Sequence, residues 1–136
     1  MKSTKNKKKA PKAPTVAKLI KKLDSVFSTY IRRKYKKGWY AQCFTCGVTK
    51  NWKELQNGHY ISRSVKSLRF DERNCHPQCV GCNIFKHGAM DEYALALQRK
   101  YGDDILKELN KLKNQSKRFT SAELNEMIKR YGIQDK

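Results

Sequence analysis

The sequence RFDERNCHPQCVGCN (residues 69–83), together with CFTC at residues 43–46, decides the fold of this chain. Each stretch carries two cysteines separated by two residues, and that spacer lets both sulfurs of a pair face one ion from a tight turn. We therefore predict a closed tetrahedral zinc site whose four thiolate ligands are Cys43, Cys46, Cys79 and Cys82. Since no coordination position stays open, the zinc is expected to be structural. The alternative is a redox dithiol, for which one pair would suffice.

Charge is the other strong signal in this 136-residue chain, which has the length of one domain. Lys and Arg number 31 against 12 Asp and Glu, a net charge of +19 that favours a polyanionic partner, either nucleic acid or an anionic membrane surface. No apolar run approaches the ~20 residues of a membrane span, so we expect no integral membrane protein. No apolar segment follows the basic N-terminus, so we also expect no secretory signal. The fifth cysteine, Cys75, is predicted to be a packed free thiol.

Residues 1–14 are rich in lysine and poor in apolar side chains. This composition predicts a disordered basic arm, which either contacts DNA phosphates or only keeps the protein in solution. Residues 15–136 are expected to form a single domain of the α+β class. Its parts are a helix with an apolar stripe at steps of three and four (16–37), a zinc-containing core with short strands (39–90) and C-terminal helices (91–132). Short strands or extended segments are predicted at residues 39–43 and 58–61, and Gly102 is predicted to end the first C-terminal helix.

The order of residues around the cysteines is similar to a known nuclease motif. His59, Asn74, Cys79-Val80-Gly81-Cys82 and Asn83 resemble the HNH, or ββα-metal, pattern, and the final Asn resembles the phage endonuclease VII type. Over roughly residues 16–131 the chain also resembles the phage NinG (Rap) recombination family. The stretches that carry this resemblance are FSTYIRRKY (27–35), CFTCG (43–47), GHYISR (58–63), LRFDERNCHPQCVGCN (68–83) and EYALALQRKYG (92–102).

The resemblance implies a zinc-braced ββα-metal core with a role for each motif residue. His59 would be the general base that takes a proton from water. Asn74 would hydrogen-bond the backbone and keep the His59 hairpin oriented. Asn83 would be an oxygen ligand of a catalytic Mg²⁺ or Mn²⁺ ion, distinct from the zinc because hard ions select oxygen ligands.

One position departs from the pattern, because Gly58 stands where most HNH nucleases carry an Asp that binds the metal. A second protein ligand is therefore missing from its usual place. His76 is the first candidate to replace it, since NinG-like sequences carry a histidine after Asn-Cys. Weaker candidates are His87, Asp71 and Glu72.

The resemblance implies a DNA endonuclease that cuts branched recombination intermediates such as Holliday junctions, in the cytoplasm of a phage-infected bacterial host. The two-fold symmetry of such junctions suggests a homodimer. Candidate phosphate contacts are Arg63, Arg69, Arg73, Lys86, Arg32 and Arg33, with solvated charge or salt bridges to Asp71 or Glu72 as the alternative for the first three. The alternative functions are a non-catalytic zinc module that binds branched or single-stranded DNA, with Trp52 or Tyr60 stacking on bases, and an HNH enzyme that nicks any duplex.

Overall fold

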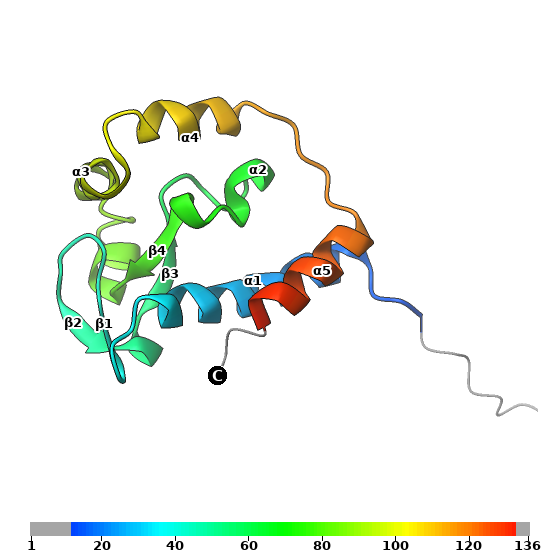
Figure 1. Ribbon diagram of the computed structural model, residues 1–136, viewed down its shortest axis with the longest axis horizontal. Coiled ribbons are helices and arrows are strands. Elements are labelled where there is room, and N and C mark those ends of the chain that lie inside the picture. Colours follow the sequence, from blue (N-terminus) through cyan, green and yellow to red (C-terminus); the bar gives the residue numbers. More distant parts are fainter. Residues whose placement is uncertain (1–11, 133–136) are drawn as a thin grey trace, which may run out of the picture.

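Helices and short strands make up the regular structure of residues 12–132, the part of the chain that the computed structural model describes (Figure 1). The helices are α1 (Val16–Lys34), α2 (Lys66–Arg69), α3 (Met90–Tyr101), α4 (Ile105–Lys113) and α5 (Ser121–Gly132). The strands are β1 (Tyr40–Gln42), β2 (Thr49–Asn51), β3 (Gln56–His59) and β4 (Cys75–Gln78). This content confirms the α+β class. Most of the basic arm predicted at residues 1–14 lies outside the described residues.

Helix α1 has the apolar stripe that the sequence predicts. Thr15 caps its start, because the Thr15 hydroxyl accepts a hydrogen bond from the Lys18 amide at 3.2 Å. The buried side chains are Leu19, Leu23, Phe27 and Ile31, and α5 packs along the helix, side by side with it in Figure 1. The helix ends at Lys34 and not at residue 37, because the backbone of Lys37 instead pairs with Tyr40 in an isolated antiparallel bridge.

Two antiparallel hairpins form the centre of the fold. Strands β1 and β2 enclose the first cysteine pair, and Gly47 makes the turn between them with a φ of +80° that favours glycine. Strands β3 and β4 pair with Gly58 opposite His76 and His59 opposite Cys75. The predicted strand at Gly58–Ile61 therefore begins two residues earlier than expected and ends at His59.

After β4 the chain makes a five-residue π-helical turn, η4 (Gly81–Phe85), and then enters α3. Helices α3 and α4 pack around Leu68 of α2 through Tyr93, Leu97, Ile105 and Leu109, all of them buried. Gly102 ends α3 with a φ of +97°, as the sequence predicts. None of the helices between residues 12 and 132 combines the length and the apolar character that crossing a membrane requires.

Candidate functional site

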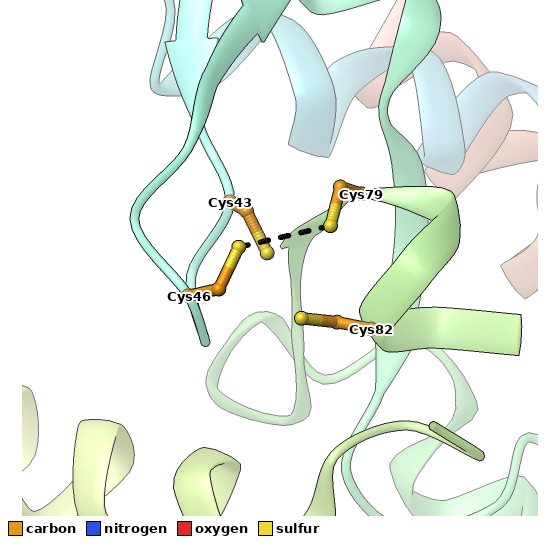
Figure 2. Close-up of side chains that lie close together, drawn as sticks. All are labelled: Cys43, Cys46, Cys79 and Cys82. Atoms are coloured by element: carbon orange, nitrogen blue, oxygen red, sulfur yellow. Dashed lines mark hydrogen bonds between the residues drawn. The ribbon is translucent and has the colours of Figure 1, made fainter. Parts of the chain in front are cut away.

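The four predicted zinc ligands gather in space (Figure 2). Cys43 and Cys46 follow β1, whereas Cys79 and Cys82 follow β4, and the four sulfur atoms all lie within 4.8 Å of one another. The Sγ atoms of Cys46 and Cys79 are 3.7 Å apart, close to the ~3.8 Å that tetrahedral Zn–S bonds of about 2.3 Å require. The cluster can therefore hold a metal ion such as zinc.

Burial and hydrogen bonding affect the thiols of this cluster differently. Burial alone would raise the pKa of Cys43, but hydrogen bonds from the Thr45 hydroxyl and from backbone amides outweigh it and lower that pKa to about 6. Burial raises the pKa of Cys82 to about 12, and hydrogen bonds to Cys79 and Cys46 contribute to that rise. A cation held by all four sulfurs would favour the thiolate form of each cysteine.

A hydrogen bond holds the two cysteine turns together. The amide of Phe44, between the first two cysteines, donates to the carbonyl of Pro77 in β4 at 2.8 Å. This contact brings the first turn onto the strand that leads to the second. Since Asn83 follows Cys82 directly, the cluster also fixes the start of η4 relative to the β3–β4 hairpin.

Beside this cluster, α1, β3 and η4 enclose a pocket of about 400 Å³, which we call the His59 pocket. It contains His59 and Asn83, the two residues whose meeting the motif requires, together with Arg63 and His87. Asn83 Nδ2 donates to Gln56 Oε1 at 2.8 Å, and this bond fixes which way the carboxamide points. The other lining residues are Asp24, Phe27, Ser28, Asn57, Gly88 and Met90.

His59 is held in the form that a general base needs. Its Nε2 lies 2.9 Å from the carbonyl oxygen of Arg69, and because a carbonyl only accepts, Nε2 carries the proton and Nδ1 keeps a lone pair. Burial lowers the pKa of His59 below its ordinary 6.5, outweighing the Arg69 carbonyl and the charge of Asp24, which raise it. The imidazole is therefore neutral at pH 7.

Asn74 makes the backbone contacts predicted for it. Its Oδ1 accepts from the Ile61 amide at 2.8 Å, and its Nδ2 donates to the carbonyls of Ile61 and Leu68 at 2.9 and 3.3 Å. The side chain is fully buried, so these bonds also satisfy its polar atoms. They tie the segment after His59 to the chain that returns toward β4.

His76 does not lie in the His59 pocket, and its prediction as a metal ligand is wrong. The ring is fully buried and stacks on Phe44 with a centroid distance of 3.9 Å. A tyrosine hydroxyl lies within hydrogen-bonding distance of each ring nitrogen. These are Tyr93 Oη at 3.1 Å from Nδ1 and Tyr101 Oη at 2.9 Å from Nε2. Burial and the nearby charges of Lys100 and Lys34 lower the pKa of His76 to about 3, so it is a neutral core residue.

The three weaker candidates for the missing metal ligand lie in different places. His87 lines the His59 pocket, with an exposed side chain and a φ of +52°. Asp71 instead caps the short helix after Phe70 by accepting from the Arg73 amide at 2.9 Å. Glu72 pairs with Lys34 at 2.7 Å and accepts from Tyr30 at 2.9 Å, so neither acid faces the pocket.

The residues predicted to contact phosphate also differ in their surroundings. Arg63 is exposed and lines the His59 pocket, whereas Lys86, the residue directly after η4, is exposed but is not among the residues that line it. Two others are in salt bridges. Arg73 binds Asp71, as the alternative allowed, and also Glu108, whereas Arg69 binds Asp24, an acid that the alternative did not include. Arg32 and Arg33 lie over the ring of Trp52, 5.3 and 5.2 Å from its centroid.

Sequence reasoning missed Asn57 and Asp24 in the His59 pocket. Asn57 lies two residues before His59 on β3, so the period of a strand puts both side chains on one face. The two-residue period of a strand was therefore the sequence signal that could have identified Asn57. Asn57 Oδ1 is buried and has no hydrogen-bond partner among the described residues. Asp24 reaches the pocket from α1, a contact that no local pattern predicts.

Trp52 and Tyr60, the residues suggested for base stacking, are not free surface aromatics. Trp52 is only 8% exposed, and Tyr60 packs on Tyr93 with ring centroids 5.4 Å apart. The more exposed aromatic side chains are those of Phe85, Trp39 and Tyr40, at 77%, 64% and 56%.

Comparison with known proteins gives one consistent family. A family model described as the bacteriophage lambda NinG protein matches residues 1–136. Protein ninG of Escherichia phage 933W is 31% identical over 113 residues, which are 82% of this chain and 54% of that protein. Protein ninG of Salmonella phage P22 is 32% identical over 91 residues, 66% of this chain and 43% of that protein. This chain thus spans about half the length of these relatives, and no solved structure matches it.

Proposed function

Since this chain belongs to the NinG family of phage proteins, we propose that it is a metal-dependent endonuclease that hydrolyses DNA at branched recombination intermediates such as Holliday junctions. The observation that carries the proposal is the His59 pocket, where a neutral imidazole with a free Nδ1 lone pair lies with Asn83 and the exposed Arg63. The chemistry needs these three elements: a base, an oxygen donor and a cation for phosphate.

In this reaction His59 Nδ1 takes the proton of the attacking water, while the Arg69 carbonyl keeps the ring in the correct tautomer. Arg63 binds the scissile phosphate through its guanidinium. Asn74 is a positioning residue, because its hydrogen bonds to the Ile61 backbone hold the chain just after His59 in place.

The pocket also offers oxygen donors suited to Mg²⁺ or Mn²⁺, the ion this chemistry would use. Asn83 has its Nδ2 committed to Gln56, so its Oδ1 is available to a cation. Asn57 Oδ1 is a buried acceptor with no protein partner among residues 12–132, the kind of atom that an ion would satisfy. A bound ion supplies charge neutralisation of the scissile phosphate and of the departing oxygen. The thiolate cluster is not part of this step and serves as the structural zinc site.

A binding protein without catalytic activity is the second candidate, and one observation favours it. Asp24 is the only carboxylate among the described residues lining the pocket, and it is held by Arg69. A cation site made mainly of amide oxygens is weaker than one with free carboxylates.

A nicking assay separates these functions. Zinc-loaded wild type and His59→Ala are incubated with a labelled four-way junction and a linear duplex of equal length, with Mg²⁺ or Mn²⁺. The endonuclease proposal expects the wild type to cut the junction in preference, and His59→Ala to bind equally but cut about 10²–10⁴-fold more slowly. Binding without cutting by the wild type supports the second candidate, and equal cutting of junction and duplex supports a nicking enzyme without structure preference.

A further inference from the structure

A second hollow of about 670 Å³, which we call the knuckle groove, borders the cysteine cluster at Cys43 and Cys46. The end of α1 and strand β1 form one wall with Tyr35, Lys37 and Tyr40, and the end of α3 forms the other with Arg99 and Lys100. The first cysteine turn is also part of the lining. No described residue lines both the knuckle groove and the His59 pocket.

The groove carries cations without compensating acids. Lys37, Arg99 and Lys100 are all exposed, and no Asp or Glu is among the described residues that line the groove. None of the three forms an ion pair with another described residue, in contrast to Lys34, Arg69 and Arg73. Lys100 Nζ lies over the ring of Tyr35, 4.9 Å from the centroid, which orients this charge along the groove wall.

Aromatic surface lies beside these charges. Tyr40 lines the groove and is 56% exposed, whereas its neighbour Trp39, 64% exposed, is not among the residues that line it. An open tyrosine ring beside three cations offers a surface on which a base can stack. Cations that follow a backbone, together with open aromatic faces, are the features by which proteins bind single-stranded nucleic acid, because only unpaired bases offer a face for stacking.

We propose that the knuckle groove binds an unpaired segment of a DNA strand, with a base on Tyr40 and its phosphates on Lys37, Arg99 and Lys100. The inference rests on the proposed action on DNA and adds a second contact on the same substrate. Cys43 and Cys46 line the groove, and Cys82 adjoins Asn83 of the His59 pocket, so a shared metal ion would hold the two sites at a fixed separation. A strand opened near a branch point then reaches both sites at once.

Fluorescence polarisation tests the proposal with a labelled oligothymidine of about 12 nucleotides and a duplex of equal length. Zinc-loaded protein is used without added Mg²⁺ or Mn²⁺, so that binding is measured apart from cleavage. The variants are Tyr40→Ala and the triple change of Lys37, Arg99 and Lys100 to Gln. Matched controls are Leu95→Ala, an exposed apolar residue of α3, and the triple change of Lys107, Lys111 and Lys129 to Gln.

We expect Tyr40→Ala to weaken oligothymidine binding by about 10-fold, and the groove triple variant to lower the salt-dependence slope by about 2. The duplex should be bound with little change by Tyr40→Ala. Equal losses in groove and control variants, or a Tyr40→Ala effect as large on duplex as on single strand, would overturn the proposal. Either result leaves the His59 assay unaffected, and loss of cutting in His59→Ala with intact oligothymidine binding separates the two sites.

Discussion

Replacing His76 with Phe distinguishes a buried core histidine from the metal ligand that the family resemblance suggested. The ring of His76 is fully buried against Phe44, and its pKa is lowered to about 3 from an ordinary 6.5. Below pH 6.5 the His76 imidazole becomes protonated in the unfolded chain but stays neutral in the folded chain. Stability from this residue is therefore complete above pH 6.5 and is lost progressively as the pH falls toward 3.

The size of the effect follows from the linkage relation. Between pH 7 and about pH 5.5, the unfolded imidazole gains most of a proton while the folded one gains almost none, which lowers the free energy of unfolding by about 1.3 kcal/mol. This figure depends mainly on the pKa in the unfolded chain, so a folded pKa one unit higher would change it little. Phe cannot take up a proton, so the variant lacks this contribution.

Urea unfolding of the zinc-loaded wild type and of His76→Phe at both pH values measures the difference. Phe packs less well beside Tyr101 and lowers stability at both pH values, and acid release of zinc affects both proteins, so the readout is the difference between their pH dependences. We expect the variant to lose about 1.3 kcal/mol less than the wild type on acidification. His87→Gln, which removes an exposed histidine, is the matched control and should behave as the wild type.

An identical pH dependence of wild type and His76→Phe would refute this reasoning. A variant that also binds Mn²⁺ more weakly, measured by calorimetry at pH 7, would return His76 to the role of a ligand. The structure leads us to expect unchanged Mn²⁺ binding, because hydroxyl groups of Tyr93 and Tyr101 occupy both ring nitrogens.

Three further predictions concern the cluster, the base and the arm. Cys79→Ser should release zinc, measured by a chromogenic chelator, and unfold the centre of the protein, because structural zinc is worth about 10–16 kcal/mol in small zinc domains. His59→Ala should keep both its zinc and its melting temperature. Similar unfolding of the two variants would contradict the division into structural and catalytic residues. The wild-type cleavage rate should rise with pH to a plateau, with its midpoint below 6.5, because burial lowers the pKa of His59 and the base acts in its neutral form; a midpoint above that value would contradict the assigned tautomer and burial. Deleting residues 2–12 removes six lysines and should lower the salt slope of DNA binding by up to about 5, with the cleavage rate at saturating DNA unchanged, whereas an unchanged slope would make the arm a solubilising tail only.

The features that the sequence predicted correctly are those set by local spacing. Leu19, Leu23, Phe27 and Ile31 are buried because the period of a helix puts them on one face. The four cysteines converge because a two-residue spacer gives each pair one direction, and Phe44 joins the two turns through the Pro77 carbonyl. Gly102 ends α3 because its positive φ suits glycine.

The features that it did not predict depend on contacts between distant segments. All four residues of β4 are buried, so alternation along this strand gives no sign of which way His76 faces. Its partners, Tyr93 and Tyr101, lie 17 and 25 residues later on α3. Likewise, Arg69 is removed from the predicted phosphate contacts by Asp24, which is 45 residues away. The exposure of the two tryptophans also depends on contacts between distant segments, because Trp52 is buried under two arginines of α1 while Trp39 is open.

The missing carboxylate at position 58 has a packing cause that also points to its replacement. A Cβ atom on Gly58 would lie 1.9 Å from Gln78 Oε1, and Gln78 is held in place by bonds from its Nε2 to Thr45 Oγ1 and to the Gly88 carbonyl at 3.1 and 2.9 Å. Position 58 therefore faces the buried side of the hairpin, and a side chain there would displace Gln78 instead of reaching the His59 pocket. The residues of β3 that do face the pocket are Asn57 and His59. If the proposed function is correct, Asn57 is the residue of this strand best placed to supply an oxygen ligand, because its Oδ1 is buried there without a partner among the described residues.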